Sequence, residues 1–214
     1  MRLVRTQARL TINQLKDVEK IILEAVRTND FRYLNFYVSS KLKMSNESKE
    51  LLRELSAYEA EFTTKRIKKY YPYKDTGVVK IEGDAEDFLI STTLNKPSAT
   101  IEDVYNAFAL SATNVYTQVL EEDDVEEAVQ QKTAGLLSVQ AMALAGLAVL
   151  GTANMTRNEV ASQLNMQVDW VLDLELNNCP DCEDYADNSP YDPDEVDGLI
   201  PLHANCGCTL VPIE

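Results

Sequence analysis

All four cysteines of this 214-residue chain lie at or after position 179, and its only histidine lies among them. The sequence reads CPDC at 179–182 and, after an acidic loop, HANCGC at 203–208. Two cysteines separated by two residues can direct both sulfurs at one tetrahedral Zn²⁺, and the His203 to Cys206 spacing repeats that geometry. In a reducing compartment this grouping favours a metal over disulfides. The sequence therefore predicts a small zinc-binding module at residues 176–214.

The module offers five candidate ligands for four positions. Cys179 and Cys182 form the firm pair, and the second pair comes from His203, Cys206 and Cys208. If this part of the chain is extended, Cys206 and Cys208 point to the same side, because side chains alternate along a strand. A turn would instead favour His203 with Cys206. Both arrangements remain open, and sulfur-rich ligation favours zinc over magnesium or calcium.

A structural role suits this metal. Residues 177–214 contain few large apolar side chains and could not build a core of their own, whereas bound zinc supplies roughly 10 kcal/mol or more of folding free energy. The competing interpretations are disulfides formed after release from a cell, and free thiols.

The residue pattern argues against catalysis. Zinc deaminases need a His-x-Glu, but Ala204 and Asn205 follow His203, and no second histidine can serve as a base. The CPDC sequence lacks the strand-before, helix-after setting of a thioredoxin motif. We therefore expect a protein that is not an enzyme.

Charge divides the chain into a basic and an acidic part. Residues 1–80 carry 17 Lys and Arg against 10 Asp and Glu, whereas residues 81–214 carry 3 against 25, which gives a formal net charge of −15. A chain this acidic is a poor candidate for tight nonspecific DNA binding. Within the basic part, KRIKKYYPYK at 65–74 mixes cations with aromatic rings, which suits phosphate contacts or an acidic protein partner. The simpler interpretation of this run is a charged helix end.

The periodicity predicts a mainly α fold. Apolar residues recur at helical spacing over 11–28, and a second helix begins at Ser45 or Asn46 and ends near Tyr70, before Pro72. Short β-leaning segments at 77–81 and 88–93 could pair as a small hairpin. We expect a basic helical region over 1–75, then the hairpin followed by a helical core over 76–175, then the metal-binding module.

Three further helices are expected in the core. Thr100 and Asp103 form a capping box for a helix over 101–119, and Asp124 begins a long helix that runs to about Asn154. A second capping box, formed by Thr156 and Glu159, predicts a separate short helix to about residue 165.

The core contains a long uncharged segment. The 24 residues at 133–156 are rich in Ala and Leu and carry no charge, which is enough length to cross a bilayer. Polar residues interrupt the segment at positions 138, 140, 152 and 154. We therefore interpret it as a long central apolar helix buried by other helices, with insertion into a membrane during a later event as the alternative.

The order of the C-terminal motifs resembles one protein family. A helix start TRNE at 156–159, then Trp170, then CPDC and PLHANCGC at 201–208 are similar to the Mu F-like minor head proteins of tailed bacteriophages, the head morphogenesis family. The match covers about the last 60 residues. Ala204 and Gly207 replace the family's usual proline and arginine, and Glu175 stands where an aspartate is common, but the proposed metal ligands are unaffected.

The resemblance implies a virion structural protein. Such a minor capsid component is made in the host cytoplasm, and the lack of a secretory signal also favours synthesis there. It binds the portal or neighbouring head proteins during head assembly or DNA delivery. It would act in multiple copies, its basic N-terminal half could also contact packaged DNA, and a membrane is not an expected partner. The alternatives are a membrane-active DNA-ejection protein and a zinc-dependent nucleic-acid-binding regulator.

Overall fold

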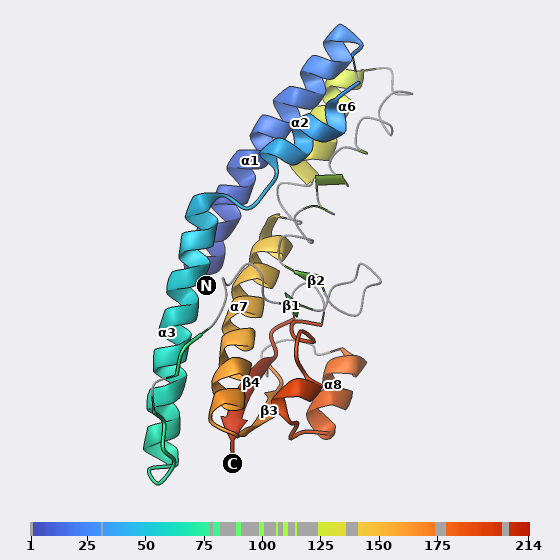
Figure 1. Ribbon diagram of the computed structural model, residues 1–214. Helices are drawn as coiled ribbons and strands as arrows, with labels where there is room; N and C mark the ends of the chain where they lie inside the picture. Colours follow the sequence, from blue (N-terminus) through green and yellow to red (C-terminus); the bar gives the residue numbers. More distant parts are fainter. Residues whose placement is uncertain are drawn as a thin grey trace. The chain divides into compact units, whose positions relative to one another are not determined.

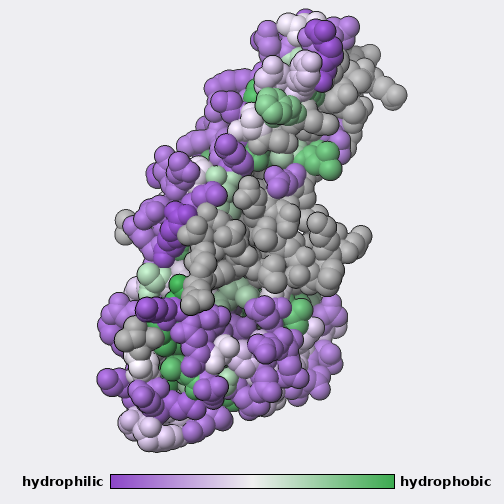
Figure 2. Space-filling model, viewed as in Figure 1, coloured by the Kyte–Doolittle hydropathy of each residue, from purple (hydrophilic) through white to green (hydrophobic). Residues whose placement is uncertain are grey.

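The protein is mainly helical, with short antiparallel strand pairs (Figure 1). The computed structural model describes residues 2–30, 32–77, 79–81, 89–90, 99–100, 106, 109–110, 114, 124–135, 141–173, 179–202 and 206–214. The chain forms two compact units, one from Met1–Ser48 with Glu102–Ala145 and the other from Lys49–Ile101 with Gly146–Glu214. In the view of Figure 2 the described surface is dominated by hydrophilic residues, with small hydrophobic patches between them.

The first unit is built on helix α1 (Arg2–Thr28), which packs against α2 (Leu34–Lys41) and α6 (Val125–Gly135). The predicted apolar stripe is its core side, with Leu15, Val18 and Ile22 all fully buried. The carboxylate of Glu126 accepts two hydrogen bonds from the Arg27 guanidinium, at 2.7 and 3.0 Å, which ties the end of α1 to the start of α6.

Helix α1 ends at a left-handed residue, as the asparagine there permits. Asn29 has φ +53°, its N–H donates to the Val26 carbonyl, and the Asp30 N–H donates to the Ala25 carbonyl. This pair of bonds is the Schellman arrangement, which satisfies the last free carbonyls of a helix. The predicted end at Thr28 is confirmed.

Helix α3 (Asn46–Tyr70) has the bounds that its sequence predicts. The Ser45 hydroxyl accepts a hydrogen bond from the Ser48 N–H at 3.1 Å, which is the expected N-cap. The helix ends at Tyr70, two residues before Pro72.

Helix α7 (Ala141–Gln163) corrects the predicted break at Thr156. The Thr156 side chain does not cap a new helix; its hydroxyl donates to the Thr152 carbonyl at 2.8 Å and lies 2.9 Å from the Ser56 hydroxyl of α3. Because these buried partners satisfy the hydroxyl, the helix continues through it. It ends at a second Schellman arrangement, with Asn165 at φ +49° and its N–H bonded to the Ser162 carbonyl.

The long apolar helix is not found as predicted. The uncharged segment divides between α6, residues 136–140, which lie outside the described residues, and α7, which itself contains Arg157 and Glu159. Among the helices that the structure describes, none has the length and apolarity needed to span a membrane. Of the helix predicted over 101–119, residues 106, 109 and 110 are helical, and most of the remainder lies outside the described residues.

The predicted hairpin is wrong in its first strand. Strand β1 (Leu89–Ile90) pairs with β2 (Ala99–Thr100), and the described residues of 77–81 form no strand. The reason lies at Lys80, whose backbone N–H donates to Gln163 Oε1 at 3.1 Å and whose carbonyl accepts from Gln163 Nε2. A side chain of α7 thus occupies the backbone groups that a partner strand would need.

The second unit places its core around an antiparallel pair, β3 (Gln167–Val171) and β4 (Thr209–Ile213), in which Trp170 lies opposite Leu210. Buried side chains alternate with half-buried or exposed ones along both strands, so one face of the pair is internal. Helix α8 (Pro180–Asp187) packs on β3, and a 3₁₀ turn, η3 (Pro193–Glu195), follows. The buried cluster joins the C-terminal segment to residues of α3, α7 and β3, including Ile67 and Val160.

Candidate metal centre

Three cysteine sulfurs converge inside the second unit. The Sγ atoms of Cys182, Cys206 and Cys208 all lie within 4.8 Å of one another, and the Cys182 and Cys206 sulfurs are 3.8 Å apart. The three side chains are buried, and all four cysteines are free thiols. The cluster therefore could hold a metal ion, and the group that forms it among the described residues consists of cysteines alone.

The separation of the Cys182 and Cys206 sulfurs fits two ligands of one tetrahedral ion. Zinc–sulfur bonds of about 2.3 Å at the tetrahedral angle separate two ligand sulfurs by about 3.8 Å, the separation of Cys182 and Cys206. A disulfide would need about 2.05 Å between the sulfurs. The geometry favours ions that accept thiolate ligands over calcium or magnesium.

Helix α8 positions the first pair of candidate ligands. Cys179 is its N-cap residue, Pro180 occupies the first turn, and Cys182 lies in that same turn. The Cys182 N–H donates to the Cys179 sulfur at 3.4 Å. The Cys179 sulfur is nevertheless not part of the group whose sulfurs all lie within 4.8 Å of one another. The free N–H groups and the dipole at a helix N-terminus favour negative charge, and therefore thiolates, at this end.

The second pair lies on the chain that leads into β4. Cys206 and Cys208 are both 2 % exposed and both reach the cluster, which is the behaviour expected of an extended segment. Of the two arrangements that the sequence left open, this is the one in which Cys206 and Cys208 share a side. His203 lies outside the described residues.

Burial and the neighbouring thiols shift the pKa values of the cluster cysteines. The hydrogen bond from the Cys208 thiol, against the cost of burial, lowers the pKa of Cys206 to about 5. Burial, followed by the hydrogen bond with Cys179, raises the pKa of Cys182 to about 12, and the bond to Cys206 followed by burial raises the pKa of Cys208. The neighbouring thiols therefore stabilise the thiolate form of Cys206. A divalent cation would replace the remaining thiol protons.

Asn154 fixes the backbone next to Cys208. Its buried side-chain amide donates from Nδ2 to the Cys208 carbonyl at 3.2 Å and accepts from the Leu210 N–H at 2.9 Å. Both backbone groups lie on the edge of β4 that is not paired with β3. The Asn154 side chain therefore makes the hydrogen bonds that a third strand would make there. The clamp limits the movement of Cys208 relative to the cluster.

Arg157, one turn further along α7, extends this attachment. Its Nε donates to the Glu59 carboxylate of α3 at 3.0 Å, and its Nη1 donates to the Thr209 hydroxyl at the start of β4. The two charged side chains are 24 % and 11 % exposed, which makes this a largely buried ion pair. The sequence pattern places Asn154 at a helix end and Arg157 in the TRNE motif, but it does not predict these contacts. The available signal was an asparagine in a segment otherwise rich in Ala and Leu.

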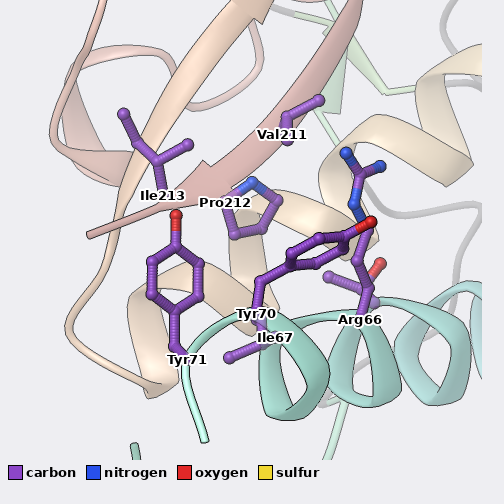
Figure 3. A pocket seen from close by; sticks show the side chains of 8 residues that line it. Arg66, Ile67, Tyr70, Tyr71, Val211, Pro212 and Ile213 are labelled. Carbon is purple, nitrogen blue, oxygen red and sulfur yellow. The ribbon is translucent and has the colours of Figure 1, made fainter.

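A groove lies between the end of α3 and strand β4 (Figure 3). It has a volume of about 350 Å³, and Arg66 and Tyr70 extend from α3 toward Val211 and Pro212. These α3 residues belong to the basic, aromatic run at 65–74. Two lysines of this run contact side chains of the same helix. Lys65 pairs with Glu61, and the Lys69 ammonium lies 5.2 Å from the centre of the Tyr70 ring.

No protein-family model matches the chain, and comparisons with curated proteins and with solved structures give no match.

Proposed function

We propose that the C-terminal cluster binds one structural Zn²⁺ through Cys182, Cys206 and Cys208, with Cys179 as the fourth ligand. The observation that carries this proposal is the convergence of three buried free thiols at a spacing that suits a tetrahedral ion. Cys179 is the favoured fourth ligand because its sulfur already contacts the Cys182 N–H. His203 is the competing fourth ligand.

The role of this zinc is to join two segments that are distant in sequence. Bound zinc supplies cross-linking bonds in place of a larger apolar core. Cys182 holds the first turn of α8, while Cys206 and Cys208 hold the chain entering β4. A site with four protein ligands leaves no position for a reacting water, which supports a protein that is not an enzyme.

We further propose that the chain is a minor capsid component of the Mu F-like kind, which acts in the virion and binds the portal or adjacent head proteins. Support comes from the C-terminal motif order, in which the metal-binding cysteines are the most specific part. The groove beside β4 adds a surface with the arginine and tyrosine side chains that are enriched at protein interfaces. Assembly through complementary surfaces needs no reacting group.

The virion assignment is tested with purified particles of the phage that encodes the chain. Mass spectrometry of particles purified by density gradient should detect the chain in a fixed, low ratio to the major capsid protein. Particles from an amber mutant of the gene should lack it and show reduced head assembly or infectivity. A chain present in infected cells but absent from washed particles would contradict the assignment.

A nucleic-acid-binding regulator is the second candidate, because the groove and the basic run around it could contact phosphates. The two candidates differ in salt dependence. A regulator that contacts several phosphates loses affinity steeply as salt rises, whereas a capsid component with a net charge of −15 should show weak DNA binding at 150 mM salt.

A further inference from the structure

Trp170 carries a buried polar atom that the fold leaves without a partner. Its side chain is 2 % exposed and stacks on Tyr185 of α8, with ring centres 4.7 Å apart and ring planes 19° from parallel. Its indole Nε1–H makes no hydrogen bond of ordinary geometry with the described residues. A buried tryptophan N–H normally has an acceptor, because leaving it unpaired forfeits the hydrogen bond that water supplied.

The cysteine cluster lies in the same buried core as the indole. Trp170 lies opposite Leu210 in the β3–β4 pair, and Cys208 lies two residues before Leu210 on the same buried side. Trp170 and the cluster cysteines belong to one packed core. The hydrogen bond with Cys206, followed by burial, raises the pKa of the Cys208 thiol. The Trp170 indole has a smaller influence and lowers this pKa.

The state of the sulfur decides whether it can satisfy the indole. A neutral thiol is a weak acceptor, whereas a thiolate is a strong one because the acceptor is charged. Metal binding removes the proton from each cysteine ligand. The Trp170 indole N–H, which lacks a partner while Cys208 is a thiol, would therefore gain an acceptor when the metal binds.

We propose that Trp170 is a positioning residue of the metal centre, whose indole N–H donates a hydrogen bond to the Cys208 thiolate when the metal is bound. This inference rests on the proposed zinc site. The bond would orient the Cys208 sulfur from the side, while Asn154 fixes its backbone. Outer partners of this kind typically alter metal affinity by about 10–100-fold.

The absorption of bound Co²⁺ is a readout that a change in packing alone should not alter. An N–H donor stabilises the sulfur lone pairs, so removing it should shift the sulfur-to-cobalt charge-transfer band to longer wavelength. The full chain is titrated with Co²⁺ as wild type, as Trp170→Phe, and with the single tryptophan replaced by benzothienylalanine, which has the indole shape without the N–H. Tyr185→Phe is the matched control, because it keeps the stacked ring and leaves the indole intact.

The expected result is a red-shifted band and an affinity weaker by about 10–100-fold in both altered proteins, with Tyr185→Phe like wild type. An unchanged band and affinity in the folded benzothienylalanine protein would overturn the role of Trp170 and leave the zinc site standing. If Trp170→Phe fails to fold, the benzothienylalanine protein decides the question, since its ring volume is conserved. A wild-type chain that binds neither Co²⁺ nor Zn²⁺ would overturn the proposed site itself.

Discussion

The side-chain amide of Asn154 bonds to the Cys208 carbonyl at 3.2 Å, so a buried residue of α7 holds the backbone of a candidate metal ligand. The same side chain accepts a hydrogen bond from the Leu210 N–H. These two bonds occupy backbone groups on the edge of β4 that is not paired with β3. Pro212, further along β4, has no N–H that could pair with another strand there. Asn154 therefore holds the backbone on both sides of Thr209, next to the candidate ligand Cys208.

Replacing Asn154 with Ala should destabilise the protein by about 2–4 kcal/mol, because two buried backbone groups lose their partners. Urea unfolding followed by the fluorescence of Trp170 measures this change. Ser162→Ala, at an exposed position of the same helix, is the control and should change the unfolding midpoint little. Equal stability of Asn154→Ala and wild type would show that the clamp is dispensable.

The Arg157–Glu59 pair should contribute more than an exposed pair of the same chemistry. We expect Glu59→Gln to cost about 1–3 kcal/mol, because the Arg157 charge would remain partly buried without its carboxylate. The Glu61–Lys65 pair lies on the exposed side of α3, so Glu61→Gln should leave the unfolding curve unchanged. A double-mutant cycle that adds Arg157→Gln isolates the coupling; a coupling near zero would contradict the structural role of this pair.

The fourth ligand can be identified by two matched substitutions. Cys179→Ser should weaken zinc binding strongly and reduce the sulfur-to-cobalt absorption, since one of four sulfur ligands is lost. His203→Ala should leave both nearly unchanged. The opposite pattern, with normal absorption in Cys179→Ser and loss of binding in His203→Ala, would assign the position to the histidine.

Metal removal should destabilise the chain. A ligand that binds only the folded state raises stability with its concentration, so we expect a higher thermal midpoint with excess Zn²⁺ than with a chelator. Because binding displaces thiol protons, affinity should also fall as the pH is lowered toward about 5, where Cys206 itself gains a proton. Calorimetric scans at pH 7.5 and 5.5 measure both effects. Identical midpoints with zinc and with the chelator at pH 7.5 would contradict them.

Local signals predicted both ends of α3 and the C-terminal end of α1, but α1 begins at Arg2 rather than at residue 11. The bounds of α3 follow from the Ser45 cap and from Pro72, and the end of α1 follows from its apolar periodicity. Thr156 gives the same local signal as a cap, yet Ser56, a hundred residues earlier in the chain, satisfies its hydroxyl inside a continuous helix. Long-range partners of this kind are absent from any local pattern.

The candidate site shows the same division. Strand alternation predicts that Cys206 and Cys208 share a side, and both lie in the group of converging sulfurs with Cys182. Cys179, the other cysteine of the CPDC motif, is not part of that group. The clamp by Asn154 and the unpaired indole of Trp170 were not, because both depend on which strand edge and which face meet in three dimensions. The described residues of 77–81 form no strand for a similar reason, because the Gln163 amide bonds to the Lys80 backbone.

The most direct test of the central claim is elemental analysis of the full chain, purified without added metal, together with a count of reactive thiols under denaturing conditions. The account predicts one zinc per polypeptide in the wild type, four thiols that react once the chain is unfolded, and loss of the metal in Cys182→Ser and Cys206→Ser. A wild-type chain without stoichiometric metal, or one whose cysteines are paired as disulfides, would contradict it.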